Sequence, residues 1–309
     1  MTAADLGTIT IEYEITGEGT PLLLVMGLGS QLIHWPDEFV DQLADRGFQV
    51  IRYDNRDMGL STKIDGEVPG LGRTVASLVS KRLARSSYVL ADMADDGAQL
   101  LDHLGIAAAH VVGVSMGGMI AQSIAIGHPD MVLSLTSIMS NTGDRRNGRP
   151  ALGLLAKMSR LLDASPKPMP DKVSEQMTGQ MMDTGVAIAR LISGPHFDEA
   201  QERLTIQRAF DRSYTPQGML RQMLAISASP DRTRQLRTLA VPTLVVHGLV
   251  DPLVRPSGGI ATARAIPGSR LLMFPDMAHD LPRNRWDEVI DAITTNAARS
   301  RRAAATAAR

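Results

Sequence analysis

A serine inside a glycine-flanked pentapeptide is the residue of this sequence best placed to act as a nucleophile. Gly113-Val114-Ser115-Met116-Gly117 matches the pattern G-x-S-x-G. The pentapeptide ends an apolar run that predicts a strand and opens a run that predicts a helix, which is the setting of a nucleophile elbow. In so tight a turn, side chains two residues either side of the serine would collide, and glycine removes them. We therefore predict Ser115 as a covalent nucleophile.

A serine hydroxyl is a weak nucleophile, so it needs a base within hydrogen-bond reach and an acid that orients this base. Asp251 and His279 each follow an apolar run that predicts a strand, and ligands meet open α/β sheets at the carboxyl ends of strands. We predict His279 as the base and Asp251 as the acid. His34 is the nearest rival base, because it follows the glycine-rich loop after an earlier strand. Asp276 and Asp280 are the alternative acids.

The negative oxygen that forms when a serine attacks a carbonyl group requires hydrogen-bond donors. The amide of Met116 begins the predicted helix, where backbone N–H groups favour an anion. The second amide should come from the MGLGS loop after the run PLLLVM, most naturally from Leu28. Loss of one such donor typically costs about 2.7 to 4 kcal/mol of transition-state stabilisation. Because both donors are backbone groups, no simple side-chain deletion would remove them.

Short apolar runs bounded by turn residues predict the buried parallel strands that must position these groups. The four clearest runs are 21–26, 48–53, 110–114 and 242–247, and two more fit at 132–139 and 270–274. Helical patterns lie between or after them at 37–46, 91–104, 116–127, 257–266 and 286–298. This alternation predicts an α/β fold with a mostly parallel central sheet flanked by helices on both faces.

The alternation stops after residue 139 and resumes near residue 241, an interruption too long for a loop. Its pattern is mostly helical, so we predict a helical cap inserted at 141–240 into a core formed by 1–140 and 241–298. The Ala- and Arg-rich end at 299–309 is expected to be a flexible tail. The cap segment is rich in methionine, which suits an ordinary helix core and a forgiving apolar pocket about equally.

A basic amphipathic stretch at 73–85 has two interpretations. Such a face could lie on lipid or bind acidic groups. The favoured hypothesis is a helix that packs beside the mouth of the pocket with its charges in water.

The composition excludes several other classes of protein. The chain has 309 residues, 44% of them hydrophobic and 21% charged, as expected of a soluble folded protein. Its net charge of -1 provides no overall field to gather nucleic acid or to coat an anionic membrane. Because cysteine is absent, disulfides, thiolate nucleophiles and cysteine-ligated metals are excluded.

The first residues alternate like a strand instead of forming a signal peptide, and no apolar run is long enough for a spanning helix. We therefore expect a cytoplasmic protein without stable membrane insertion. The sequence is compatible with a homodimer.

From about residue 8 to residue 298, the sequence resembles the α/β-hydrolase superfamily. The motifs that carry the resemblance stand in the family's order: LLLVMGLG, YDNRDMGLS, GVSMGG, HGLVD and MAHD. The triplet VMG in place of the commoner His-Gly, followed by Trp35-Pro36 and Tyr53-Asp54, is similar to the branch of aclacinomycin methylesterase and related actinobacterial lipase- and esterase-like hydrolases. The resemblance implies Ser115, Asp251 and His279 as a catalytic triad, with Leu28 and Met116 forming the oxyanion hole.

The resemblance further implies that Asp54 and Arg56 brace the loops near the oxyanion hole. The sequence departs from the family at Met26, which replaces the usual histidine, and in the length of the basic stretch at 73–85. Both departures leave the choice of substrate open.

We expect a carboxylic-ester hydrolase that works through an acyl-enzyme and needs no cofactor or metal. Its expected partner is a small-molecule substrate, a small to medium apolar or methyl ester. The same triad can open lactones, run perhydrolysis or hydrolyse carbon-carbon bonds, and a ligand receptor on this fold is the non-catalytic alternative. A dinucleotide site is disfavoured, because Leu32 stands at the third glycine position and Trp35-Pro36 interrupts the helix that should hold the pyrophosphate.

Overall fold

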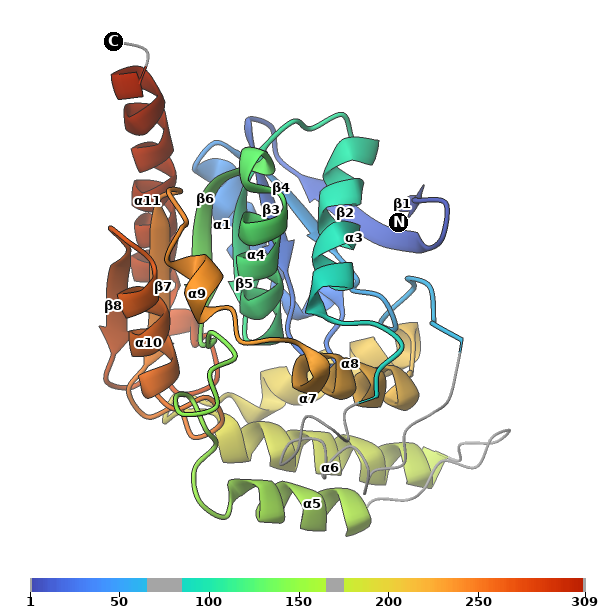
Figure 1. The fold of residues 1–309 in the computed structure, drawn as a ribbon. Coiled ribbons are helices and arrows are strands. Elements are labelled where there is room, and N and C mark those ends of the chain that lie inside the picture. Colours follow the sequence, from blue (N-terminus) through green and yellow to red (C-terminus); the bar gives the residue numbers. More distant parts are fainter. Residues whose placement is uncertain (1, 66–84, 165–174, 308–309) are drawn as a thin grey trace.

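A mixed sheet runs through the centre of the molecule in this computed structural model, which describes residues 2–65, 85–164 and 175–307 (Figure 1). Its strand order is β1-β2-β4-β3-β5-β6-β7-β8. The pairings of β2 with β1 and with β4 are antiparallel, whereas β3 to β8 are parallel. The strands are β1 (Thr2–Asp5), β2 (Thr10–Thr16), β3 (Thr20–Val25), β4 (Phe48–Tyr53), β5 (Ala109–Val114), β6 (Val132–Ile138), β7 (Thr243–Gly248) and β8 (Arg270–Phe274).

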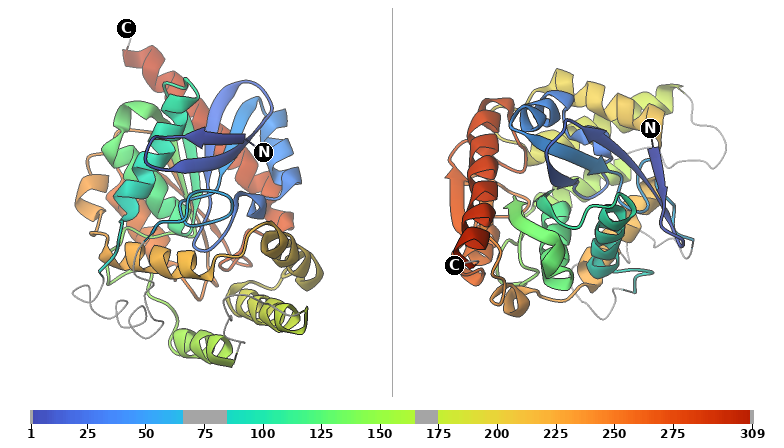
Figure 2. Two further views of the ribbon diagram at one scale, coloured as in Figure 1. Left: turned by 90° about the vertical axis from the view of Figure 1, so that its right-hand side faces the viewer. Right: turned by 90° about the horizontal axis from the view of Figure 1, so that it is seen from above.

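Helices cover both faces of the sheet (Figure 2). One face packs against α1 (Asp37–Asp45) and α11 (Trp286–Ala307), whose apolar side chains share a core with β3 and β7. The other face packs against α3 (Leu90–His103), α4 (Met116–Gly127) and α10 (Ser257–Ala265). Because both faces are covered, every residue of the central strand β5 is buried, as a parallel strand in a doubly covered sheet requires.

The fold class and the six predicted strands agree with the structure, and their ends differ by no more than one residue. The first residues form two strands instead of one. Gly7, with a φ of 84°, turns the chain between β1 and β2, and the Asp5 carboxylate accepts a hydrogen bond from its amide at 2.9 Å. Glycine adopts this left-handed conformation without steric cost.

The structure corrects the predicted end of the last helix. Helix α11 runs through Ala307 instead of ending at residue 298, because the Ala- and Arg-rich segment consists of strong helix formers. The expected flexibility of 299–309 stays a prediction.

Most of the segment predicted as a cap folds into helices α5 to α8, which lie together at one end of the sheet, whereas α9 lies beside the sheet and packs against α10 and α4 (Figure 1). In the described residues α6 packs between α5 and α7. These helices are α5 (Leu154–Ala164), α6 (Glu175–Ile192), α7 (Glu199–Arg212), α8 (Pro216–Ala228) and the short α9 (Thr233–Leu236). Almost all of the basic stretch at 73–85 lies outside the described residues. Short 3-10 helices occur at η1 (Leu32–His34), η3 (Pro129–Met131) and η4 (Arg283–Arg285).

Among the helices that the structure describes, none combines the length and the apolar character needed to cross a bilayer.

Candidate active site

Ser115 occupies the sharp turn between β5 and α4. Its φ of 55° and ψ of -118° lie in a backbone region that residues other than glycine rarely adopt. The two flanking glycines make this turn sterically feasible. A Cβ on Gly113 would stand 2.1 Å from the carbonyl oxygen of Gly117, and one on Gly117 would stand 2.0 Å from that of Val25. Close packing of the surrounding backbone therefore holds Ser115 in this strained conformation. The sharp turn presents the serine hydroxyl at the end of β5.

The structure brings His279 and Asp251 together with Ser115. The Ser115 Oγ and His279 Nε2 atoms are 2.9 Å apart, and His279 Nδ1 is 2.8 Å from Asp251 Oδ2. An ionised carboxylate can only accept, so Nδ1–H donates to Asp251 and Nε2 is left to accept the serine proton. His279 follows β8 and Asp251 follows β7, so three strand ends assemble the set.

The surroundings of Asp251 favour its ionised form although the residue is only 2% exposed. Burial by itself raises the pKa of this carboxyl group, but hydrogen bonds from His247 and His279 outweigh burial and hold the pKa below its ordinary value. The amides of Leu253 and Val254 also donate to its Oδ1 atom, both at 2.9 Å. Both oxygens of the carboxylate that orients His279 thus accept hydrogen bonds, which hold the carboxylate in place.

Two backbone segments border the serine. Met116 is the first residue of α4, so its amide has no acceptor within the helix. The loop after β3 approaches from the other side, where a Cβ on Gly27 would stand 3.4 Å from Ser115 Cβ. Leu28, the next residue, is half-buried. The structure therefore brings both predicted donor segments to the nucleophile.

The rival residues are engaged elsewhere. The Gln31 amide donates to His34 Nδ1 at 3.0 Å, and burial lowers the pKa of His34. Asp276 binds Arg285 and His196, whereas Asp280 accepts bonds from backbone amides. These contacts hold the three side chains away from the serine–histidine pair.

Asp54 braces the loop beside the serine, as the resemblance implies. Its Oδ1 accepts from the Leu32 amide at 2.7 Å, and its Oδ2 accepts from the Leu60 amide at 2.8 Å and from Arg212 at 2.6 Å. Arg56 pairs with Asp96 at 2.6 Å. Arg212 was missed by the sequence reasoning, because it lies on α7 and nothing in the spacing relates it to Asp54.

Within the described ranges, the structure contains no cluster of three or more His, Cys, Asp or Glu side chains that could hold a metal ion. The expectation that the reaction needs no cofactor stays a prediction.

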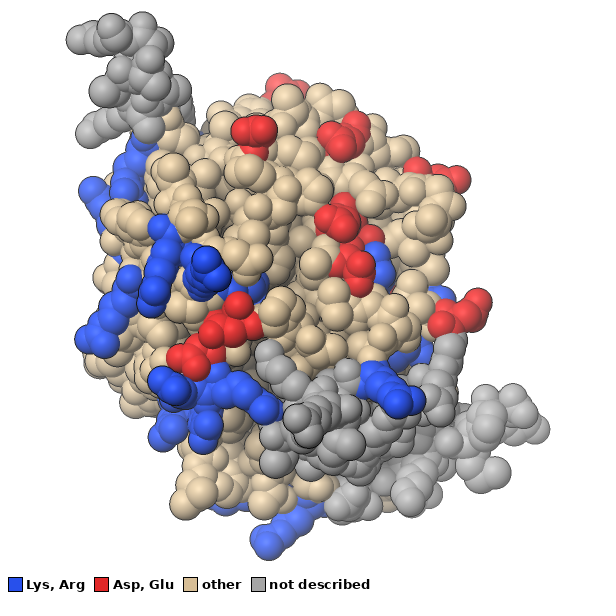
Figure 3. Space-filling model, in the orientation of Figure 1, with Lys and Arg blue, Asp and Glu red and all other residues tan. Residues whose placement is uncertain are grey.

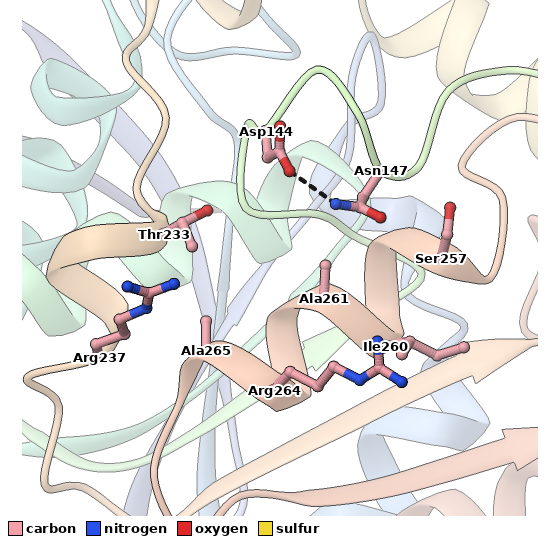
Figure 4. A pocket seen from close by; sticks show the side chains of 9 residues that line it. All are labelled: Asp144, Asn147, Thr233, Arg237, Ser257, Ile260, Ala261, Arg264 and Ala265. Carbon is pink, nitrogen blue, oxygen red and sulfur yellow. Dashed lines mark hydrogen bonds between the residues drawn. The ribbon is translucent and has the colours of Figure 1, made fainter.

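A separate surface pocket of about 400 Å³ lies between α9, α10 and the loop at 144–147 (Figure 4). Arg237 and Arg264 line it together with Asp144 and Asn147, and no triad residue does. Lys and Arg side chains gather over this part of the face (Figure 3). A net charge of -1 for the whole chain therefore does not mean that the charges are spread evenly over the surface.

Comparisons with known proteins agree with this architecture. A family model described as alpha/beta hydrolase fold matches residues 20–282. Rhodomycin D methylesterase DauP of Streptomyces sp. (strain C5) is 29% identical over 277 residues, which cover 85% of each chain. A thermophilic esterase from Thermogutta terrifontis has a TM-score of 0.68 and 25% identity, with 94% of each chain covered. The enol-lactonase from Burkholderia xenovorans LB400 shares the fold, with a TM-score of 0.70 and 20% identity over 96% of this chain and 99% of that one.

Proposed function

The chain belongs to the α/β-hydrolase family, and from this premise we propose that it is a serine hydrolase that cleaves carboxylic esters through an acyl-enzyme. The observation that carries the proposal is the hydrogen-bonded chain from Ser115 Oγ to His279 Nε2 at 2.9 Å and from His279 Nδ1 to Asp251 at 2.8 Å. The relative from Streptomyces sp. (strain C5) is a methylesterase by name, and the structural relative from Thermogutta terrifontis is an esterase. Both names support ester hydrolysis.

In the proposed mechanism, Ser115 Oγ attacks the carbonyl carbon of the ester while His279 Nε2 takes the serine proton. The carbonyl oxygen becomes an alkoxide, which the amides of Leu28 and Met116 stabilise. His279 then returns the proton to the leaving alcohol, and an acyl group stays on Ser115. Water, activated by His279, releases the acid and restores the serine. Asp251 holds the imidazole in the required tautomer and stabilises its cation throughout.

We propose small to medium apolar esters or methyl esters as substrates. Met219 of α8 supports an apolar site, because its side chain lies against the loop that carries Leu28: a Cβ on Gly29 would stand 3.0 Å from Met219 Cγ. Methionine adapts to varied apolar shapes. The same triad could open a lactone, and the enol-lactonase is a neighbour in fold alone. A substrate panel therefore has to include lactones.

A fluorophosphonate probe tests the nucleophile. We expect labelling of the wild type and none of Ser115→Ala, whereas Ser123→Ala should be labelled normally. Ser123 lies on the same helix, and its hydroxyl donates to the Met119 carbonyl group at 3.0 Å. Unchanged labelling of Ser115→Ala would refute the assignment. A wild type that binds ligands but neither reacts with the probe nor turns over any ester would favour the receptor alternative.

Turnover tests the base. His279→Gln should lower kcat by about four to six powers of ten, measured with p-nitrophenyl esters of increasing chain length beside aromatic methyl esters and lactones. If most activity remained, His34 would become the base to test.

A further inference from the structure

The peptide between Leu28 and Gly29 needs an external support. It belongs to a turn closed by a 3.3 Å hydrogen bond from the Ser30 amide to the Gly27 carbonyl group, and Gly29 has a φ of 71°. Two glycines leave such a turn many accessible conformations. Yet an oxyanion donor must be held where the charge will develop, since a preorganised donor costs no reorganisation during the reaction.

Gln222 of α8 supplies this support. Its Oε1 atom accepts a hydrogen bond from the Gly29 amide at 2.9 Å, and its Nε2 atom donates to the Arg56 carbonyl group at 2.9 Å. An amide N–H can only donate and a carbonyl oxygen can only accept, so these partners fix the orientation of the glutamine. The side chain has no exposed surface. Gln222 therefore ties the loop after β3 to the loop after β4.

The helix that carries Gln222 is itself anchored to the core. The neighbouring Arg221 makes a buried ion pair with Asp57 at 2.7 Å. Gly218, one turn earlier, packs so closely that a Cβ there would stand 2.2 Å from the Asp57 carbonyl oxygen. A glutamine on an anchored helix can hold its partner peptide in one place.

A second contact restrains the end of the same loop. Gln31 Nε2 donates to the carbonyl groups of Ala209 and Ser213 at 2.7 and 2.8 Å, where α7 ends. The loop is thus held at Gly29 and at Gln31 by the helical segment, while Asn55 Nδ2 holds its start through the Met26 carbonyl group at 3.0 Å.

We propose that Gln222 is a positioning residue for the oxyanion hole. By occupying the Gly29 amide, it sets the orientation of the Leu28–Gly29 peptide and thereby the direction of the preceding Leu28 amide, which is left for the alkoxide. The inference rests on the proposed function and deepens it: through Gln222, the helical segment contributes to transition-state stabilisation. Gln222 touches no reacting atom in this role.

The test compares Gln222→Met, which keeps the size of the side chain and removes both hydrogen bonds, with Asn296→Leu. Asn296 is a matched control, because it is a buried amide that donates to the Leu135 and Pro242 carbonyl groups at 3.0 and 3.3 Å, the latter just before β7 begins. For each variant, kcat and KM are measured with the best p-nitrophenyl ester. Affinity is measured for a trifluoromethyl ketone of the same chain length and for the product acid.

The trifluoromethyl ketone reports on the oxyanion hole directly. Ser115 Oγ bonds to the ketone carbon, the serine proton passes to His279, and the ketone oxygen becomes an alkoxide that needs the same amides as the reaction does. Removing a donor outright lowers kcat by about 10²- to 10³-fold. Because Gln222→Met displaces a donor without removing it, we expect about a 10- to 100-fold fall in kcat and an equal fall in ketone affinity. KM and affinity for the product acid should not change.

Gln222→Glu provides a rescue, since a carboxylate oxygen can still accept from the Gly29 amide. We expect kcat and ketone affinity between those of the wild type and Gln222→Met. Equal loss of kcat and of ketone affinity in Gln222→Met and Asn296→Leu would overturn the inference while leaving the proposed function intact. A wild type that neither hydrolyses esters nor binds the ketone would overturn the proposed function and this inference together. If Gln222→Met does not fold, Gln222→Glu decides alone: a partial fall in kcat with an equal fall in ketone affinity supports the inference, and wild-type values of both, or a fall in one without the other, contradict it.

Discussion

The buried ion pair between Arg221 and Asp57 should be a principal anchor between α8 and the core. The Arg221 Nε atom lies 3.0 and 2.9 Å from the two Asp57 oxygens, and its Nη2 atom lies 2.7 Å from Oδ1. The two side chains are 5% and 0% exposed. Asp57 also accepts from the Tyr88 hydroxyl at 2.7 Å and from the Ile64 amide at 2.9 Å. Burial and the negative charge of Asp57 raise the pKa of Tyr88, so Tyr88 stays protonated and keeps donating.

Among the described residues, Arg221→Met would leave Asp57 charged and buried with these two neutral donors. Breaking a buried pair from one side costs about 3 to 5 kcal/mol, and we expect a loss of this size in the free energy of unfolding measured by urea denaturation. Arg203→Met is the control, because the Arg203–Asp183 pair has a similar distance of 2.7 Å but side chains 41% and 65% exposed. Exposed pairs contribute about 0.2 to 1 kcal/mol.

A double variant separates the stranded charge from lost packing. Asp57 has a φ of 72°, a conformation that asparagine tolerates, so Asp57→Asn removes the charge without backbone strain. Arg221→Met with Asp57→Asn should recover much of the stability lost in Arg221→Met. The reasoning is refuted if Arg221→Met destabilises the protein no more than Arg203→Met does, or if the double variant is as unstable as the sum of the two single ones.

Two further predictions concern the elbow and the acid. Gly117→Ala would place a methyl group 2.0 Å from the Val25 carbonyl oxygen, so we expect a stability loss of at least about 1 to 3 kcal/mol and loss of fluorophosphonate labelling. A Cβ on Gly127 of the same helix would meet no described atom beyond the helix's own backbone within 4 Å, so Gly127→Ala should leave both unchanged; equal behaviour of the two variants would contradict the packing argument. Asp251→Asn should lower kcat about 10⁴-fold. Because the pKa of Asp251 is lowered from its ordinary 3.8, its ionisation stabilises the fold above that pH, and this contribution is lost as the pH falls through the folded-state pKa. The difference in free energy of unfolding between wild type and Asp251→Asn should therefore shrink between pH 6 and pH 3, and a constant difference would count against an ionised, stabilising Asp251.

Much of the fold could be predicted because its signals are local. A buried strand such as β5 is a continuous apolar run, and α4 begins directly after it, so the turn at Ser115 is readable from neighbouring residues. Asp251 and His279 could be predicted as partners because each follows a strand, and the carboxyl ends of parallel strands share one edge of the sheet. The end of α11 was wrong because an Ala- and Arg-rich segment has high helix propensity as well as low complexity.

The sequence by itself thus determined which residues could do the chemistry and where along the chain the strands that present them lie. Only the tertiary structure decided which groups support that chemistry. Gln222 is 193 residues from Gly29, and Arg212 is 158 residues from Asp54, and no periodicity relates residues so far apart. Such contacts depend on how the inserted helices pack against the sheet, and that packing is decided by the shapes of many side chains at once, not by any local pattern.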